Sequence, residues 1–354
     1  MKSSKEQQHI ERVQDHLLSW YRQNRRKLPW RENISGYRTW VSEIMLQQTR
    51  VEAAIPYYER FLNELPDLKH LAAADDDLLH KLWEGLGYYN RVRNMKKCAQ
   101  VCVEKYGGEL PCDYDTLCTL PGIGPYTAGA VASIAFHQRV CAVDGNVLRV
   151  FSRILENRED ISKEATKKHY KEYVGCYLPQ EEDMSDFNQA IMELGALICL
   201  PNHPPLCTQC PLRQECKAYA HGIQNELPIK AGKKERRIEA YTVLVCVCDG
   251  KMALMQRPAK GLLANLYGFA MQEGKLTSKA VRKKYPKAAH IVRLRPHVHV
   301  FSHVEWHMEA FLVETSETDE NYHTIEEITE QYAVPSAFQP FYQAACEWIR
   351  AKEQ

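Results

Sequence analysis

The chain has 354 residues, enough for two domains that each bury a hydrophobic core. Its 46 basic and 45 acidic residues nearly cancel, so the overall charge does not indicate a nucleic-acid partner. No uninterrupted apolar run reaches the roughly 18 residues that a membrane-spanning helix requires. The polar segment 1–11 carries no secretory signal, so we expect a protein of the reducing cytoplasm with no membrane association.

Up to about residue 225 the apolar side chains recur at helical spacing. In the first such segment Ile10, Val13 and Leu17 fall on one face of a helix. We therefore predict an all-helical first domain over residues 1–227. Its predicted helices include residues 10–24, 51–62, 78–83 and 187–197.

The pattern changes after a segment that contains Pro228, Gly232 and a basic run, which we assign as a linker over residues 228–238. Residues 241–248 are β-branched and apolar, and Asp249-Gly250 is a hairpin turn signal. An α+β domain is therefore predicted over residues 239–354. Its predicted elements are a returning strand at 252–256, further strands within 297–313 and a closing helix at 336–352.

Four of the thirteen cysteines lie close together, with the spacing C-x7-C-x2-C-x5-C. They are Cys199, Cys207, Cys210 and Cys216. Four thiolates at such short spacing indicate a metal centre more than incidental core cysteines. Zinc and iron–sulfur clusters both accept four thiolates, and the spacing alone does not separate them.

The segment Leu120-Pro121-Gly122-Ile123-Gly124-Pro125 predicts a tight turn between two helices, at about residues 113–137. It resembles the helix-hairpin-helix of DNA repair proteins. There the backbone N–H groups around Gly122 and Gly124 would hold a DNA phosphate. An ordinary helix–helix connection is the alternative.

Two carboxylates are ambiguous when each is taken alone. Asp144, in Val143-Asp144-Gly145-Asn146, is typical of a helix N-cap. Glu43 is followed by apolar residues that would raise its pKa and keep it protonated. A single glutamate on a helix is, however, more often simply solvated.

Taken together, these motifs resemble the MutY family of adenine DNA glycosylases. The order is Leu28-Pro29-Trp30-Arg31, the Glu43 helix, Gly85-Leu86-Gly87-Tyr88-Tyr89, the hairpin, Val143-Asp144-Gly145-Asn146 and the cysteines, and the similarity covers about residues 10–315. The family belongs to the endonuclease III superfamily, so the resemblance implies a 4Fe–4S cluster. The family's usual C-x6-C spacing is one residue shorter than the interval between Cys199 and Cys207. We expect the extra residue to bulge out of a loop over residues 200–206.

The resemblance also assigns catalytic roles. Glu43 would be the general acid that protonates adenine, and Asp144 the ionised carboxylate that stabilises the sugar cation. Tyr126 and Asn146 would orient this pair. In bifunctional relatives a lysine replaces Tyr126, and tyrosine cannot form a Schiff base. We therefore expect base removal without strand cleavage.

By the same resemblance, the adenine pocket is formed by Trp30, Arg31, Leu46 and Gln189. Gln48, Leu86 and Tyr88 would enter the duplex around the lesion. The second domain resembles the Nudix fold, and its Phe301-Ser302-His303 matches a loop that contacts 8-oxoguanine, so Ser302 and His303 are predicted DNA-binding residues. The sequence has no magnesium-binding Nudix box, so we do not expect pyrophosphatase activity.

The sequence thus predicts a multidomain α and α+β protein: a helix-hairpin-helix glycosylase domain with an iron–sulfur cluster, then a Nudix-like α/β domain. Its expected partner is double-stranded DNA with 8-oxoguanine or guanine opposite adenine, and we expect a monomer of bacterial type, associated with the nucleoid through its substrate. Two other interpretations remain open. One is a bifunctional endonuclease III-type glycosylase and lyase, and the other is a non-catalytic iron–sulfur DNA-binding protein.

Overall fold

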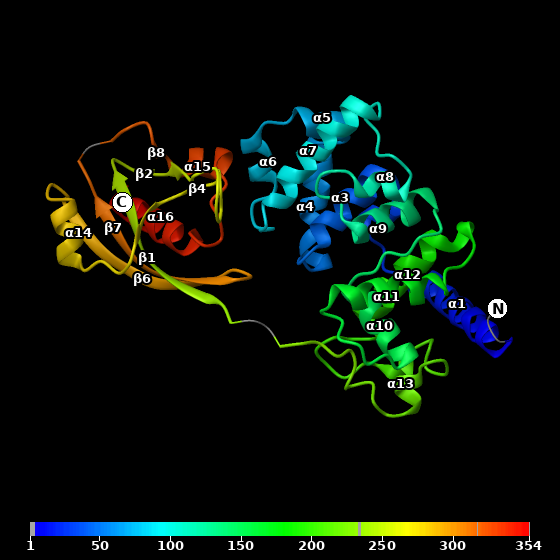
Figure 1. Cartoon of the computed structure of the whole chain (residues 1–354). Coiled ribbons are helices and arrows are strands. Elements are labelled where there is room, and N and C mark those ends of the chain that lie inside the picture. Colours follow the sequence, from blue (N-terminus) through cyan, green and yellow to red (C-terminus); the bar gives the residue numbers. More distant parts are fainter. Residues whose placement is uncertain (1–3, 233–234, 317, 354) are drawn as a thin grey trace. The chain divides into compact units, whose positions relative to one another are not determined.

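The structure, a computed structural model, describes residues 4–232, 235–316 and 318–353. The chain forms two compact units (Figure 1). Unit 1 holds the residues up to Ala73 together with Asn94–Gly232, and unit 2 holds Ala74–Arg93 together with the chain beyond residue 232. The sequence placed residues 74–93 in the helical domain, whereas their packing groups them with the second unit.

Unit 1 is helical in the part of the chain that the structure describes. Short polar side chains start several of its helices. Ser35 accepts a hydrogen bond from the N–H of Arg38, and Asp113 accepts one from Thr116. The helices are α1 (Ser4–Asn24), α2 (Pro29–Glu32), α3 (Gly36–Leu46), α4 (Val51–Glu64), α5 (Leu68–Ala73), α7 (Asn90–Lys105, which begins in unit 2), α8 (Tyr114–Cys118), α9 (Pro125–Phe136), α10 (Gly145–Leu155), α11 (Glu164–Gly175), α12 (Met184–Leu197) and α13 (Lys217–Ala220), with 3₁₀ turns η1 (Glu181–Asp183) and η2 (Cys207–Gln209).

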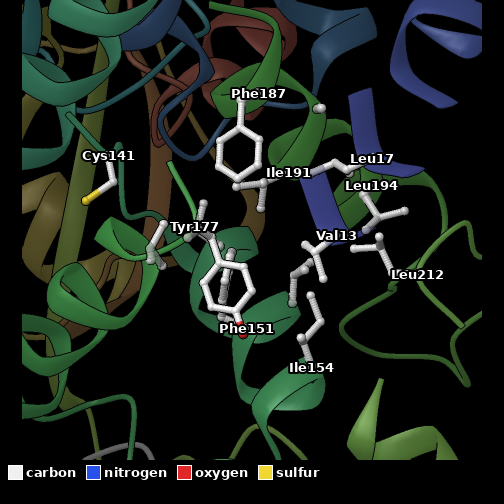
Figure 2. Close-up of a cluster of buried hydrophobic side chains, with 14 of the residues drawn as sticks. Val13, Leu17, Cys141, Phe151, Ile154, Tyr177, Phe187, Ile191, Leu194 and Leu212 are labelled. Atoms are coloured by element: carbon white, nitrogen blue, oxygen red, sulfur yellow. The ribbon is translucent and has the colours of Figure 1, made fainter. Parts of the chain in front are cut away.

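The predicted helices at 10–24, 51–62 and 187–197 are confirmed as α1, α4 and α12. Their apolar stripes meet in one core, shown in Figure 2, where Val13 and Leu17 of α1 lie near Ile191 and Leu194 of α12. This core also takes in Phe151 of α10. It fixes α12 against α10, the helix that begins directly after Asp144.

Unit 2 is built on a mixed sheet with the strand order β6-β7-β1-β2-β8, and β5 also pairs with β1. The long strands β1 and β7 are parallel, with Arg237 opposite Val304 and Val247 opposite Glu314. The elements are α6 (Asp76–Leu82), β1 (Arg237–Cys248), β2 (Lys251–Ala253), β3 (Met255–Gln256), β4 (Tyr267–Gly268), β5 (Ala270–Glu273), α14 (Ser278–Lys284), β6 (His290–Val300), β7 (Val304–Glu314), β8 (Tyr322–His323), α15 (Ile325–Gln331) and α16 (Gln339–Glu353).

The two faces of this sheet follow the alternation of side chains along β1. Val243 and Val245 belong to the core that includes Phe341 of α16, while Leu244 packs with Val281 of α14 on the other face. Figure 1 shows α14 and α16 beside these strands. The predicted helix at 78–83 corresponds to α6, and the predicted closing helix to α16.

The hairpin at Asp249-Gly250 is confirmed, because both residues have positive φ and Cys248 pairs with Lys251. The returning strand, however, is not continuous over 252–256. Strand β2 ends at Ala253, and the N–H of the buried Leu254 makes one more hydrogen bond in the register of the β2–β8 pairing, to the carbonyl of Asn321. The residues after it form β3, which pairs with β4 in a separate two-stranded sheet.

Two other predicted boundaries differ from the structure. The strand expected from residue 297 begins earlier, at His290. The linker predicted for 228–238 ends before Arg237, because β1 extends its parallel ladder with β7 to that residue. In the described residues no helix is long and apolar enough to cross a membrane.

Candidate active site

Glu43 lies in the last turns of α3 and is buried in unit 1. The hydroxyl group of Tyr126, on α9, donates a hydrogen bond to its Oε2. The pKa of Glu43 is raised to about 7, chiefly by burial; the Tyr126 hydrogen bond opposes this rise and the charge of Asp144 contributes to it. A carboxyl group with such a pKa carries a proton through much of the neutral range, as a general acid must.

Asp144 is the N-cap of α10, as its sequence context indicated. Its Oδ1 accepts from the N–H of Val147 at 2.8 Å, and its Oδ2 accepts from Nδ2 of Asn146 at 2.6 Å. The pKa of Asp144 is raised above its ordinary value by burial, and these two donors and the charge of Arg149 limit the rise. Donors aimed at both oxygens favour the charged form, so the two carboxyl groups occupy unlike environments.

Tyr126 interacts with both carboxyl groups: it donates a hydrogen bond to Glu43, and its pKa is affected by the charges of Glu43 and Asp144. Its pKa is raised well above the ordinary value, first by burial and then by the charges of Glu43 and Asp144. Its hydroxyl therefore stays protonated and remains a donor to Glu43. The structure thus brings together all four residues that the resemblance assigned to catalysis: Glu43, Tyr126, Asp144 and Asn146.

Arg149 is a buried residue of this site that the sequence analysis missed. Its Nη2 donates to Oδ1 of Asn146 at 2.8 Å and to the carbonyl of Gly195 at 2.8 Å. Its Nε donates to the carbonyl of Cys199 at 2.7 Å. Arg149 therefore orients the amide of Asn146. Arg149 is itself held by the carbonyls of Gly195 in α12 and of Cys199 just after that helix. An arginine three residues after Asn146, on the same helix, was the available signal.

Gly195 allows this close approach between α12 and the start of α10. A Cβ added there would lie 2.6 Å from Cβ of Asn146. Because both atoms belong to packed helices, a larger side chain would displace Asn146 from Asp144.

The four residues predicted for the adenine pocket all belong to unit 1. Arg31 Nε donates to Oε1 of Gln189 at 3.0 Å, and Trp30 packs edge-to-face on Tyr58 at 5.3 Å. Leu46 is partly buried at the end of α3, three residues after Glu43. The structure therefore joins Arg31 to Gln189 directly.

Glu193 is a second buried group that sequence reasoning missed. Its carboxylate accepts from Arg31 Nη2 at 3.0 Å and from Arg26 Nη2 at 2.8 Å. Burial alone would raise its pKa, but the hydrogen bonds from Arg26 and Arg31 lower it to about 2. Glu193 thus holds Arg31 in the orientation that meets Gln189. Its position four residues after Gln189, on the same helix face, was the signal.

All four clustered cysteines line one pocket between α10, the end of α12 and the loop before α13. Arg153 Nη1 donates to Sγ of Cys199 at 3.0 Å. This charge-assisted donor suits a thiolate. Among the described residues, no three His, Cys, Asp or Glu side chains meet closely enough to bind a single ion. Residues 200–206, where the sequence predicted an extra residue, form an irregular, largely exposed loop closed by a hydrogen bond from the N–H of Leu206 to the carbonyl of Ile198.

The predicted hairpin is formed by α8, a turn and α9. Gly122 has a φ of +77°, and a Cβ there would lie 2.6 Å from Cβ of Asn94, so this position requires glycine. Gly124 has no such restriction: it is the N-cap of α9, with open space around it.

The remaining predicted DNA-binding residues lie at turns. Gln48 is exposed just after α3, with a φ of +64°. In unit 2, Tyr88 is 54% exposed while Leu86 is buried. Ser302 and His303 are exposed in the short connection between β6 and β7, where the N–H of Phe301 donates to the carbonyl of Val304.

Comparisons with known proteins agree with this architecture. A model of the helix-hairpin-helix superfamily of base excision DNA repair proteins matches residues 41–176, and a NUDIX domain model matches residues 241–344. A thermostable thymine-DNA glycosylase superposes with a TM-score of 0.55 at 26% identity, over 61% of this chain and 98% of its own. An endonuclease III solved in a non-covalent complex with DNA shares the fold, with a TM-score of 0.52 at 24% identity over 63% of this chain and 100% of its own.

The fold and the site together define a base excision repair glycosylase of the helix-hairpin-helix class. Sequence relatives narrow this class. The adenine DNA glycosylase of Mus musculus is 35% identical, over 82% of this chain and 68% of that protein. The adenine DNA glycosylase of Buchnera aphidicola subsp. Baizongia pistaciae is 36% identical, over 72% of each. The chain belongs to the adenine DNA glycosylase family.

Proposed function

We propose that this glycosylase excises adenine paired with 8-oxoguanine, or with guanine, in duplex DNA and leaves the strand uncut. The observation that carries the proposal is the buried pair of Glu43 and Tyr126 beside the capped carboxylate of Asp144. Glycosidic cleavage needs a proton for the departing base and an anion near the cationic sugar. This pair of unlike carboxyl groups supplies both.

In the proposed mechanism, protonated Glu43 donates its proton to N7 of adenine, which turns the base into a neutral leaving group. Ionised Asp144 stabilises the positive charge that develops on the sugar, and Asn146 keeps that carboxylate oriented. Water then adds to the sugar carbon that has lost adenine and releases a proton to solvent, which leaves an abasic sugar in an uncut strand. Tyr126 holds Glu43 in position. Tyrosine has no amine that could form a Schiff base with the sugar, so we expect no strand cleavage by that route.

Adenine must leave the base stack before it can react, which costs a few kcal/mol. We propose that Trp30, Arg31, Leu46 and Gln189 receive the flipped base, and that Gln48, Leu86 and Tyr88 occupy the space it vacates. The turn with Gly122 and Gly124 would hold a phosphate at the N-terminus of α9.

A single assay tests this function against its alternatives. The full chain is incubated with a duplex that has 8-oxoguanine opposite adenine, and the strands are then separated with and without alkali. Breaks that form only after alkali are expected, because the base is removed and the sugar remains. Breaks without alkali would indicate a lyase, and no breaks would indicate a non-catalytic DNA-binding protein.

We also propose that the pocket of Cys199, Cys207, Cys210 and Cys216 holds a 4Fe–4S cluster. Four thiols line one pocket, which is the number of ligands that a 4Fe–4S cluster takes, and the resemblance to the endonuclease III superfamily favours this cluster over zinc. When bound, the cluster would cross-link the end of α12 to the loop before α13. Arg153, which donates to Cys199, would stabilise the thiolate.

Cys210→Ser is expected to remove the brown colour of the purified protein, together with its iron and sulfide, and most of its DNA binding. The physical reason is the loss of one ligand and of the cross-link. Metal analysis, visible absorption and a binding titration measure the effect. Cys112→Ser, at an exposed cysteine outside the pocket, is the matched control and should change none of them. A purified wild-type protein with zinc and no sulfide would contradict the assignment.

The loop between β6 and β7 is proposed to read the base opposite adenine. 8-Oxoguanine has an N–H and a carbonyl where guanine has an acceptor and a C–H, and Ser302 and His303 offer a hydroxyl and an imidazole. Each hydrogen bond is worth about 0.5–1.5 kcal/mol. The double substitution Ser302→Ala with His303→Ala should therefore reduce the preference for 8-oxoguanine over guanine by several-fold to about a hundredfold. Rates on both duplexes measure it, and equal losses on the two would mean that the loop is only structural.

A further inference from the structure

The loop over residues 85–89, between α6 and α7, is held in an unfavourable backbone conformation. Gly85 and Gly87 have φ of +98° and +69°, and Tyr88 has a φ of +49° although it is not a glycine. A left-handed residue with a bulky side chain persists only where its surroundings impose it. Since Tyr88 is also 54% exposed, its own packing does not supply that constraint.

Part of the constraint is local. Arg91 Nη2 donates to the carbonyls of Leu86 at 3.0 Å and Gly87 at 3.1 Å, and Trp83 Nε1 donates to the same Gly87 carbonyl at 3.0 Å. The guanidinium of Arg91 lies 5.2 Å from the ring centroid of Trp83 and 5.8 Å from that of Tyr88. The turn is therefore closed around Arg91.

The rest of the constraint comes from the C-terminal part of unit 2. Immediately before the loop, Glu84 Oε1 accepts from the backbone N–H of Val334 at 2.8 Å. Just after it, Arg93 Nη2 donates to the backbone carbonyl of Ala264 at 2.8 Å. Lys81 completes the first contact, because its Nζ donates to Glu84 Oε2 at 2.7 Å and to the carbonyl of Tyr332 at 3.1 Å.

These anchor points are buried. Ala264 and Val334 are 4% and 2% exposed, so the backbone groups that meet Arg93 and Glu84 are shielded from competing water. Tyr332 packs against the ring of Tyr267 at 4.6 Å, and α15 packs against α6. Both ends of the loop are therefore attached to residues that lie well over a hundred positions later in the chain.

We propose that Glu84 and Arg93 are positioning residues through which the C-terminal part of the chain holds the loop of Leu86 and Tyr88 ready to enter DNA. This rests on the proposed role of Leu86 and Tyr88 in filling the space that adenine vacates. A loop that is already ordered in the free protein loses less conformational entropy when it enters the duplex, so binding is more favourable. The C-terminal part of the chain would then have two roles. It would contact the base opposite adenine, and it would also influence how readily adenine leaves the base stack.

The test compares full-length variants with the wild-type chain. Glu84→Ala and Arg93→Met each remove one anchor, while Glu84→Gln keeps an oxygen that can accept from Val334. Glu104→Ala, at an exposed position on α7, is the matched control. The first readout is hydrogen exchange of the amides of residues 85–89 in the free protein. We expect it to be faster by about two- to tenfold for each anchor removed, and unchanged in Glu84→Gln and Glu104→Ala.

The second readout is function. 2-Aminopurine in place of the target adenine, with Glu43→Gln added to prevent excision, reports unstacking by its fluorescence. Single-turnover excision is measured separately with Glu43 intact. Both should fall by about two- to tenfold in Glu84→Ala and recover in Glu84→Gln. A general loss of stability would instead lower the melting temperature without selective exchange at residues 85–89.

Two results would overturn the inference. One is exchange at residues 85–89 that is the same in Glu84→Ala and Glu104→Ala, and the other is faster exchange with unchanged unstacking and excision. If the wild-type chain released no adenine, the proposed function would fail instead. The exchange measurement, which needs no DNA, would still decide whether the C-terminal residues hold the loop.

Discussion

Replacing Glu43 with glutamine is expected to lower the single-turnover rate of adenine release by about 10²–10⁴. The amide has nearly the same shape and can still accept from Tyr126, so the fold and the binding of the duplex should be retained. Only the transferable proton is lost. A rate within a few-fold of wild type, in a variant that binds the duplex normally, would exclude Glu43 as the general acid.

The pH dependence gives this prediction a second test. Because burial raises the pKa of Glu43 to about 7, the acid form is present below that pH and disappears above it. The wild-type rate should therefore fall as pH rises through about 7, and Glu43→Gln should lack this fall. Tyr126→Phe removes a hydrogen bond that lowers the pKa, so it should shift the fall to higher pH. Single-turnover rates across the neutral range measure all three variants.

Asp144→Asn should be at least as damaging, with a loss of about 10²–10⁴ in the same assay. Asparagine and aspartate are comparable N-caps, so the start of α10 should keep its hydrogen bond to Val147. What disappears is the negative charge beside the sugar. The variant should therefore melt near the wild-type temperature and bind the duplex, yet release adenine very slowly.

A substitution in the same cap motif provides the control for Asp144. Val143→Ile changes a partly buried residue next to Asp144 and leaves the charge in place, so it should retain most of the activity. If Asp144→Asn excised adenine at a rate near wild type, a mechanism with two carboxyl groups would be wrong.

Local features of this chain could be predicted from the sequence because short-range physics determines them. The helical spacing that begins at Ile10 gives α1, and Asp249-Gly250 gives the tight turn between β1 and β2. Gly122 was correctly expected in a tight turn, and the structure adds that Asn94 leaves no room for a Cβ.

The active-site assignment came from the resemblance and could not have come from spacing. Taken alone, Asp144 was typical of an N-cap, and the structure shows that it is one. The cap and the proposed catalytic role are compatible, because the hydrogen bonds that start α10 also favour the charged form of the carboxylate. Glu43 differs from a solvated glutamate only because Tyr126, 83 positions later, meets it in a buried site.

By itself, the sequence determined the helical first part, the strand-rich second part, the cysteine cluster and the motifs of the family, since each depends on neighbouring residues. Tertiary structure alone decided that Arg149 is anchored to the carbonyls of Gly195 and Cys199, that Glu193 holds Arg31 and that residues 74–93 pack with the C-terminal part of the chain. The physical reason is the same in each case. These contacts join residues that are far apart in sequence. A buried polar group must form hydrogen bonds, and the packing of the core determines which distant group is close enough to be its partner.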